Sequence, residues 1–261
     1  MTHQLPPSER AEPGLQGYAV RPRFRAAILT NEFFVDGQRL ALSDRESELL
    51  AILALRGGYM DAEAIAAAMW SDVDIVESLK ALRVYISRVR KIVPHPSLIH
   101  SEKNGYHIEA SISLDLWEID AALREQRGRD LDTVPAADLE ALYRRLQDFY
   151  ETQRVRSIRW SWFPAVELQI DSYRREVGLC LGHRLLALGR VYEAHRIAQQ
   201  LVGSDQLCEL SRELSIKIQL ALENYAVAVR QYRSFESVLR EELRAQPSPR
   251  LRLLLASHLL A

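Results

Sequence analysis

Six side chains that can donate hydrogen bonds to nucleic acid gather on one helical stretch between residues 77 and 93. They recur on the polar side of a 3.6-residue period: Lys80, Arg83, Ser87, Arg88, Arg90 and Lys91. Arginine and serine reach base edges in the major groove of duplex DNA, and lysine and arginine neutralise phosphates. This stretch therefore predicts recognition of DNA rather than a reaction. From composition alone, a basic but otherwise ordinary surface helix is the competing interpretation.

A core must hold this stretch so that its cationic side faces outward. Apolar residues recur at steps of three and four and form one stripe: Leu79, Leu82, Ile86, Val89 and Val93. The only acid, Glu77, stands in the first turn, where the helix dipole favours a negative charge. The spacing predicts an amphipathic helix with one buried side and one positive, solvated side.

Composition limits the classes of protein that this sequence can represent. The 261 residues are 48% hydrophobic and 26% charged, as in globular proteins, and the net charge is −1. Residues 20–113 contain 12 Lys and Arg against 12 Asp and Glu, and residues 114–261 contain 21 of each class. Neither part is basic overall, which argues against nonspecific coating of nucleic acid. Any DNA contact must come from local charge segregation.

The first 22 residues and the two cysteines indicate the cellular compartment of the protein. Residues 1–22 contain four prolines and little periodicity, and we expect a disordered arm. They include no apolar signal-peptide core, and no run approaches the length that spans a bilayer. Cys180 and Cys208 have no metal-binding spacing and are interpreted as reduced core thiols. A cytoplasmic protein without a membrane segment is expected.

Short alternating segments follow this arm and predict a small antiparallel sheet. They are FRAAIL from Phe24, EFFVDG from Glu32 and QRLAL from Gln38. Asp36 and Gly37 supply the positive-φ turn of a hairpin. A second hairpin is predicted in LIHSEKNGYHIEA, where Asn104 and Gly105 give a strong turn signal.

Three helices are predicted between the two hairpins. Ser43 and Glu46 form a capping-box pattern before an apolar series that stops near Gly57. Asp61 caps a second helix, AEAIAAAM, which Trp70 closes. After the connection SDVDIVE comes the basic helix, which ends before Pro94. Sheet, two helices, basic helix and hairpin, in this order, predict a winged helix-turn-helix whose third helix enters the major groove.

Residues 23–110 resemble the DNA-binding domain of OmpR/PhoB-type response regulators. The resemblance rests on LSDRESELLAILAL, Trp70, YISRVRKI and the terminal NGYHI. It implies that four side chains reach base edges or adjacent phosphates: Lys80, Arg83, Ser87 and Arg88. It further implies contacts to DNA from Arg90, Lys91, Lys103 and Asn104, and a loop facing RNA polymerase that contains Ser71, Asp72, Asp74 and Glu77. The hairpin departs from the family, because Glu102 would repel phosphate at the tip and no arginine is present there.

Beyond Leu114 the sequence is helical almost throughout, with one internal repeat. The segment from Leu188 to Ala194 aligns with the segment from Leu222 to Ala228 at an offset of 34 residues, the period of tetratricopeptide repeats. Stacked helical hairpins are therefore expected. Residues 113–261 resemble the bacterial transcriptional activator domain of SARP-type regulators. The matching pieces are the Leu114-Asp115-Leu116 entry, Trp160-Ser161-Trp162-Phe163, AVRQYRSFESVLREEL and Pro247-Ser248-Pro249.

Other chemistry finds little support. No GxSxG nucleophile motif, GxxxxGK[ST] phosphate loop or isolated acid pair occurs, so an enzyme and a bound cofactor are not predicted. Cys180 and His183 could offer two metal ligands, but a core pair is the preferred interpretation. His100 and His107 are read as solvated strand positions, although they flank the second hairpin turn. Packing is preferred over base stacking for the tryptophans, and Arg154, Arg156 and Arg159 are read as a solvated loop.

The sequence thus predicts a mainly α protein in three parts. These are a disordered arm (1–22), a winged helix-turn-helix (23–112) and an all-α domain with repeats like those of tetratricopeptide proteins (113–261). The predicted function is sequence-specific regulation of transcription, with double-stranded DNA and RNA polymerase as partners. The helical domain is expected to mediate self-association, with two copies on repeated half-sites, or contact with a partner. The alternative is a helical-repeat adaptor whose winged domain no longer binds DNA.

Overall fold

The structure, a computed structural model, describes residues 21–127, 135–151 and 160–259. We call its described residues up to Leu114 the N-terminal unit. This unit contains β1 (Arg23–Ala27), η1 (Ile28–Thr30), β2 (Glu32–Val35), β3 (Gln38–Arg39), α1 (Asp44–Arg56), β4 (Met60–Asp61), α2 (Ala62–Met69), α3 (Ile75–Ile92), η2 (Pro96–Leu98), β5 (Ile99–Glu102), β6 (Gly105–Ile108) and β7 (Ser111–Leu114). The predicted arm falls outside the described residues, except for Arg21 and Pro22.

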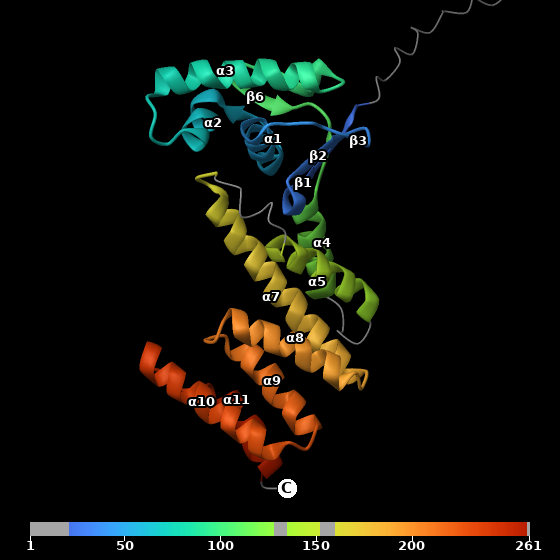
Figure 1. Cartoon of the computed structure of the whole chain (residues 1–261), viewed down its shortest axis with the longest axis vertical. Helices are drawn as coiled ribbons and strands as arrows, with labels where there is room; N and C mark the ends of the chain where they lie inside the picture. The colour runs from blue at the N-terminus through green and yellow to red at the C-terminus, as the bar shows by residue number, and fades with distance from the viewer. Residues whose placement is uncertain (1–20, 128–134, 152–159, 260–261) are drawn as a thin grey trace, which may run out of the picture.

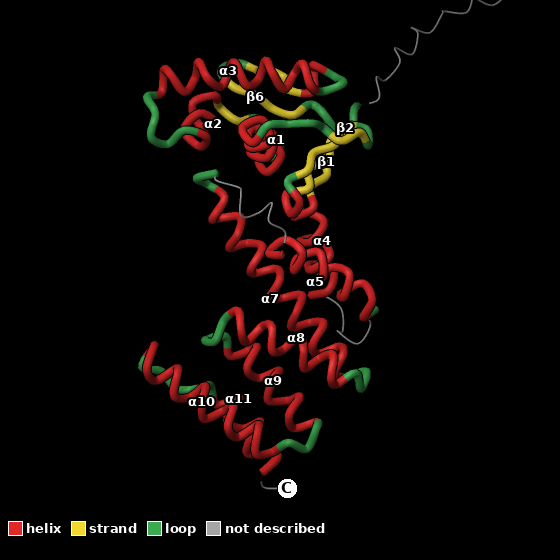
Figure 2. Tube along the Cα trace, viewed as in Figure 1, coloured by secondary structure: helices red, strands yellow, loops and turns green. Residues whose placement is uncertain are grey.

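The remaining described residues, from Asp115 to Leu259, form the helical unit. It contains α4 (Asp115–Arg127), α5 (Ala136–Glu151), α7 (Phe163–Ala187), α8 (Val191–Ser204), α9 (Glu209–Ala221), α10 (Tyr225–Leu243) and α11 (Pro249–Leu259). Figure 1 shows the two units stacked along the long axis, with α3 at one end and α10 and α11 toward the other. Figure 2 shows that the strands are confined to the N-terminal unit. A mainly helical fold with a small N-terminal sheet region is thereby confirmed.

The first sheet has the order β3-β2-β1-β7. The predicted hairpin is present, and its turn residues Asp36 and Gly37 have φ angles of 49° and 84°. The strand predicted as FRAAIL is too long, because β1 ends at Ala27. The amides of Ile28 and Leu29 donate to the Asp115 carboxylate instead of continuing the ladder. Sequence patterns also missed β7, which pairs with β1 in parallel and makes the sheet mixed rather than antiparallel.

The first two helices begin and end as their capping signals predict. Ser43 and Glu46 form the reciprocal capping box of α1, and Gly57 closes this helix with a φ of 65°. The Asp61 carboxylate accepts a hydrogen bond from the Glu63 amide at 2.9 Å, which caps α2. Trp70 is the C-cap of α2. Together α1 and α2 form the layer on which α3 packs.

The helical unit keeps the predicted repeat in its backbone. Helices α8 and α10 begin 34 residues apart, at Val191 and Tyr225. The loops before them repeat the same left-handed conformation, since φ is 73° at Gly189 and 58° at Glu223, also 34 residues apart. Consecutive helices from α7 to α10 pack side by side in Figure 1. Each helical hairpin therefore buries its apolar side against the next one.

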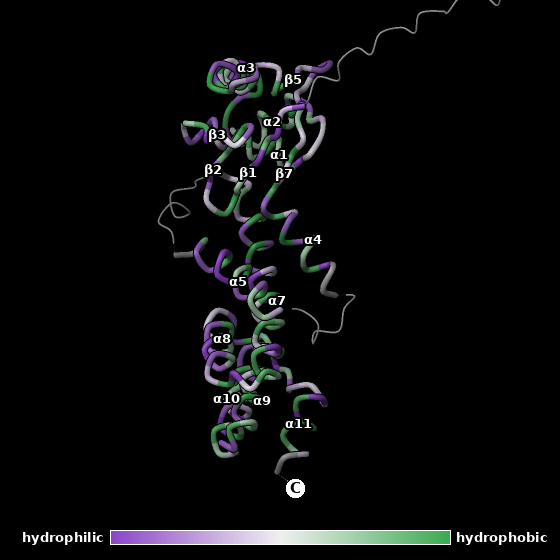
Figure 3. The backbone as a smooth tube through the Cα atoms, turned by 90° about the vertical axis from the view of Figure 1, so that its right-hand side faces the viewer, coloured by the Kyte–Doolittle hydropathy of each residue, from purple (hydrophilic) through white to green (hydrophobic). Residues whose placement is uncertain are grey.

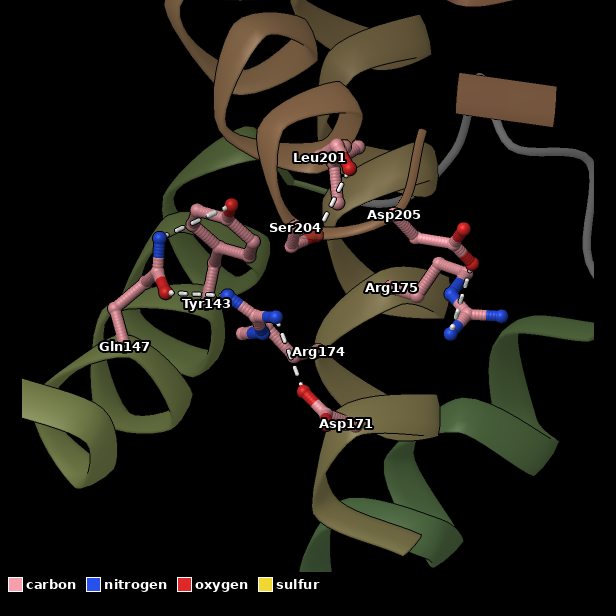
Figure 4. Close-up of polar contacts among 8 residues, drawn as sticks. All are labelled: Tyr143, Gln147, Asp171, Arg174, Arg175, Leu201, Ser204 and Asp205. Carbon is pink, nitrogen blue, oxygen red and sulfur yellow. Dashed lines mark hydrogen bonds and ion pairs between the residues drawn. The ribbon is translucent and has the colours of Figure 1, made fainter. Parts of the chain in front are cut away.

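Polar contacts join α5, α7 and α8 beside this apolar packing (Figure 4). The Gln147 amide donates to the Tyr143 hydroxyl at 3.3 Å, and Arg174 reaches both the Gln147 carbonyl oxygen and the Asp171 carboxylate. Burial raises the pKa of Tyr143 because it disfavours the phenolate. Arg175 pairs with Asp205 at the end of α8 at 3.5 Å. The Gln147–Arg174 bond thus links α5 to α7, and the Arg175–Asp205 pair links α7 to the end of α8.

The cysteines and tryptophans mainly serve packing. Cys180 and Cys208 are half-buried, and neither forms a disulfide. Trp160 is buried, Trp70 and Trp162 are half-buried, and Trp117 is 42% exposed. The described residues contain no cluster of three or more His, Cys, Asp or Glu side chains suited to a metal ion. Arg154, Arg156 and Arg159 lie outside the described residues, so their prediction stays untested.

One apolar core runs through both units, from Phe24 in β1 to Ile218 in α9. At the junction, the buried Asp115 carboxylate accepts hydrogen bonds from the amides of Ile28, Leu29 and Leu116 at 2.9–3.0 Å. The Trp117 ring covers the end of α1, where a Cβ on Gly57 would lie 2.9 Å from it. The two units therefore share a continuous, hydrogen-bonded junction. Within the described part, no helix is long and apolar enough to span a bilayer.

We predict that the substitution Asp115→Ala loosens this junction. It leaves three buried amide donors, at Ile28, Leu29 and Leu116, without their acceptor. The free energy of unfolding should fall by about 3 kcal/mol, measured by urea denaturation followed by circular dichroism. Glu236→Ala, which removes a surface ion pair with Arg240, serves as the control and should change stability by no more than about 0.5 kcal/mol. Equal effects of the two substitutions would contradict the prediction.

Candidate nucleic-acid interface

Helix α3 separates its side chains as the apolar stripe predicts. Leu82, Ile86 and Val89 are buried against the unit, and Leu79 is half-buried. Five of the six predicted donors are exposed: Lys80, Arg83, Ser87, Arg88 and Lys91. The helical unit lies on the opposite side of the N-terminal unit in Figure 1 and leaves the outer side of α3 uncovered. Figure 3 shows hydrophilic and hydrophobic residues interleaved around the same helix.

The start of α3 differs from the prediction by two residues. The helix begins at Ile75, because the Asp74 carboxylate accepts a hydrogen bond from the Val76 amide at 2.9 Å and acts as N-cap. The Ser78 hydroxyl adds a bond to the Asp74 carbonyl at 2.9 Å. Glu77 lies in the first helical turn, as the sequence predicts. The boundary was not predicted because the helix starts with Ile75 and Val76, which are apolar and β-branched and are not typical of a helix start.

Two residues predicted to contact different partners are bound to each other. The Lys80 ammonium lies 2.7 Å from the Glu77 carboxylate on the exposed surface. Such a solvated pair holds its two side chains only weakly. Lys80 is therefore partly neutralised in the free protein, whereas no ion pair is recorded for Arg83 or Arg88 in the described chain.

Arg90 braces the second hairpin instead of pointing freely outward. Its Nε and Nη2 donate to the Ile99 carbonyl at 3.1 and 2.7 Å, and Nη2 also reaches the Ser101 hydroxyl at 2.7 Å. The side chain is half-buried as a result. Its predicted role as a phosphate anchor stays a prediction, and the structure adds a second role that sets the distance between α3 and β5.

The hairpin belongs to a three-stranded sheet of order β4-β6-β5. The two-residue strand β4 was too short to be recognised from the sequence. The positive-φ turn residue is Lys103, with φ of 49°, rather than Asn104 or Gly105. Gly105 is needed for another reason, because a Cβ there would lie 2.1 Å from the Met60 carbonyl oxygen in β4. The turn signal was correct, but its glycine serves close strand approach.

The two faces of the hairpin differ. Ser101 and Tyr106 lie on the face toward α3, and together with Arg83, Lys103 and Asn104 they line a hollow between helix and hairpin. His100 and His107 pair across the strands on the opposite face, with ring centroids 5.0 Å apart. Each histidine has a carboxylate beside it, from Glu109 at 3.3 Å and from Glu102 at 3.8 Å. Glu102 is thus directed to His107 and away from the hollow. The hollow itself is of mixed charge, because Asp61 and Glu63 line it together with Arg83 and Lys103.

The loop predicted to face polymerase is exposed, as are the first residues of α3. Its acids Asp72 and Asp74 are accompanied by three exposed apolar side chains, Val73, Ile75 and Val76. Val84 is also exposed, at 49%, among the cations of α3. The exposure of these apolar residues was not predicted, because the charges alone characterised this loop in the sequence. The sequence did contain a signal for their exposure, because these apolar residues stand among charged and polar neighbours.

The helical unit identifies the family. Residues 116–257, more than half of the chain, match the bacterial transcriptional activator domain. The chain belongs to this family. Its members are regulators of transcription rather than enzymes. The SARP-type resemblance of the helical unit is thereby confirmed at the level of the activator domain.

Individual relatives in the activator-domain family agree with this assignment. The chain is 29% identical to the regulatory protein AfsR of Streptomyces coelicolor over 94% of its own length, and 28% identical to AfsR of Streptomyces griseus over 80%. It spans 24% and 22% of those longer proteins, about a quarter of their length. The structure of Mycobacterium tuberculosis EmbR in complex with a low-affinity phosphopeptide aligns with a TM-score of 0.72 at 18% identity. That alignment covers 92% of this chain and 65% of EmbR, and it shows a shared fold.

We predict that Arg90→Met loosens the hairpin of this activator-domain protein. Loss of the guanidinium bonds to Ile99 and Ser101 should speed amide hydrogen exchange between Ile99 and Ile108 about tenfold, because charge-assisted hydrogen bonds there disappear. Lys91→Met, which changes the exposed neighbour, is the control. Exchange that is equally fast in both variants would show that Arg90 does not hold the hairpin.

Proposed function

We propose that this chain is a sequence-specific DNA-binding regulator of transcription that reads the major groove with α3. The supporting observation is the exposure of Lys80, Arg83, Ser87 and Arg88 on one side of a helix that the helical unit does not cover. A major groove admits an α-helix, and arginine matches guanine with two parallel hydrogen bonds. With a net charge of −1, the chain depends on this local segregation for attraction to DNA.

The proposed contacts follow from where each side chain lies. Arg83, Ser87 and Arg88 are assigned to base edges, and the exposed Val84 suits the methyl group of thymine. Lys91 and Lys103 are assigned to phosphates, with Asn104 beside them at the hairpin turn. Lys80 would reach an adjacent phosphate only by leaving Glu77. Arg90 would position the hairpin and offer its remaining guanidinium nitrogen to the backbone.

We assign the N-terminal unit to the OmpR/PhoB type of winged helix-turn-helix. Three helices followed by a hairpin, in the order α1, α2, α3, β5 and β6, support that assignment. On the same basis Ser71, Asp72, Asp74 and Glu77, with the exposed Val73 and Val76, would face RNA polymerase. The helical unit would mediate self-association or partner contact, with two copies on repeated half-sites. We retain the proposed division of the chain into an arm, a winged domain and a helical domain.

Selection of bound sequences from a random duplex pool tests the proposed function. The purified chain should enrich one short motif, and a variant with both Arg83→Ala and Arg88→Ala should enrich it poorly. A folded chain that enriches no sequence would instead act as a helical-repeat adaptor, and the proposal would be wrong. Circular dichroism and thermal melting of both proteins establish that they are folded.

We predict that Arg83→Ala relaxes base preference at one position. A good side-chain contact to a base contributes about 1–3 kcal/mol of discrimination against the wrong base. Titration against the enriched motif and its single-base variants should therefore show this loss at one position only. If affinity falls equally for every sequence, Arg83 contacts the DNA backbone and not a base.

We predict a different result for Lys91→Ala. Removal of a phosphate contact weakens binding to all sequences alike and lowers the slope of log affinity against log salt by about one unit. Arg240→Ala is the control, because it removes a cation of α10 that is paired with Glu236 in the helical unit, and it should leave the slope unchanged. Filter binding at several salt concentrations measures both slopes. An unchanged slope for Lys91→Ala would remove its phosphate assignment.

A further inference from the structure

Arg88, one of the proposed base contacts, is held over an aromatic ring of its own helix. Its guanidinium carbon lies 5.3 Å from the centroid of the Tyr85 ring. A cation over an aromatic face at this distance is attracted by the ring quadrupole. The contact restricts a long side chain that would otherwise sample many rotamers. Arg88 is thus partly ordered before it meets any ligand.

The Tyr85 ring is itself supported by two further layers. It packs against Trp70, with centroids 5.9 Å apart and planes inclined by 37°. The Arg45 guanidinium lies over the Trp70 ring, 5.8 Å from its centroid. Two neighbouring rings with a cation at each end therefore form a ladder, Arg45–Trp70–Tyr85–Arg88, that crosses from α1 through the end of α2 to α3.

The inner end of the ladder lies at the junction with the helical unit. Arg45 Nη1 donates to the Glu48 carboxylate at 2.6 Å and to the Met69 carbonyl at 2.9 Å. The Glu48 side chain is completely buried, and burial raises its pKa while Arg45 partly offsets the rise. The helical unit reaches the same place, because the Ser161 hydroxyl donates to the Ala68 carbonyl at 3.0 Å.

Trp162 completes the contact between the helical unit and Glu48. Trp162 Nε1 and Glu48 Oε1 are both buried there, and neither has a hydrogen-bonding partner among the described residues. The indole N–H also lowers the pKa of the Glu48 carboxyl group, against the rise caused by burial. The Trp162 ring stacks on Trp160 at 5.1 Å, which fixes its place in the helical unit. A hydrogen bond between Trp162 and Glu48 would give each of these buried atoms its missing partner.

We propose that Tyr85 is a positioning residue for Arg88, and that the ladder through Trp70 and Arg45 makes the Arg88 geometry depend on how Trp162 docks at Glu48. The proposal rests on the proposed DNA-binding function. An arginine that is already ordered pays less conformational entropy on contact with a base, so its discrimination is larger. The Trp70 and Tyr85 rings would pass a shift at the junction on to Arg88, because closely packed side chains move together.

The first test uses Tyr85→Leu, with Tyr85→Phe as the conservative control. The free protein shows whether the ladder orders Arg88. In nitrogen-15 spectra the Arg88 Nε–Hε signal should carry a ring-current shift that Tyr85→Leu removes and Tyr85→Phe retains. A signal that Tyr85→Leu leaves unchanged overturns the proposal, whatever the protein does with DNA.

The second test measures discrimination among single-base variants of the enriched motif. Tyr85→Leu should lower discrimination about two- to fivefold at the position that Arg88→Ala affects, the range expected for an exposed cation–aromatic contact, with an unchanged salt slope. Tyr85→Phe should restore it. Addition of Tyr85→Leu to Arg88→Ala should cause no further loss at that position. Equal loss at every position would show that Tyr85 acts only on overall stability or phosphate binding.

The third test probes the junction between the two units. It uses the substitution Trp162→Phe, which keeps an aromatic ring but removes the indole N–H. The change should alter discrimination at the Arg88 position and shift the Arg88 signal in the free protein. Trp160→Phe is the matched control, because Trp160 shares the stack but does not act on Glu48. An Arg88 signal that responds to neither substitution, or equally to both, overturns the link to the helical unit. If the wild-type chain enriches no motif, the proposed function fails, and the free-protein spectra still decide whether the ladder exists.

Discussion

The relation between the two units depends on one buried carboxylate. Asp115 is both the first residue of α4 and the acceptor for the amides of η1, so the chain leaves the first sheet and enters the helical unit at a fixed angle. Burial raises the pKa of this carboxyl group, and three backbone amides partly offset the rise. The same contact ends β1 early, which links the length of a strand to the placement of the second unit. The apolar core that continues past Leu114 reinforces this junction.

Local signals in the sequence predicted much of the N-terminal unit. The capping box at Ser43, the Asp61 cap and the apolar stripe of α3 each depend on residues within one or two turns, and a single sequence contains that information. The outward side of α3 follows from the same stripe. The 34-residue repeat was also visible, because it relates segments of similar composition whose helix starts the structure confirms.

Contacts between distant segments were not predictable from one sequence. The pairing of β1 with β7 joins residues almost 90 positions apart, and nothing in either strand specifies its partner. Arg90 resembled any other cation of α3 until its two hydrogen bonds to Ile99 placed it against the hairpin. The ion pair of Lys80 with Glu77 was overlooked for another reason. The helix was expected to begin at Glu77 and the loop to end there, so the two residues were assigned to separate surfaces.

The absence of any spacer between β7 and α4 has a consequence for how copies would be arranged along DNA. Leu114 ends the strand and Asp115 begins the helix, so the helical unit cannot swing about a flexible tether. Two such bodies in mutual contact would hold their α3 helices at one separation and one angular phase around the duplex. Insertion of half a helical turn between two recognition sites would then rotate one protein to the far side, whereas insertion of a full turn would restore the shared face.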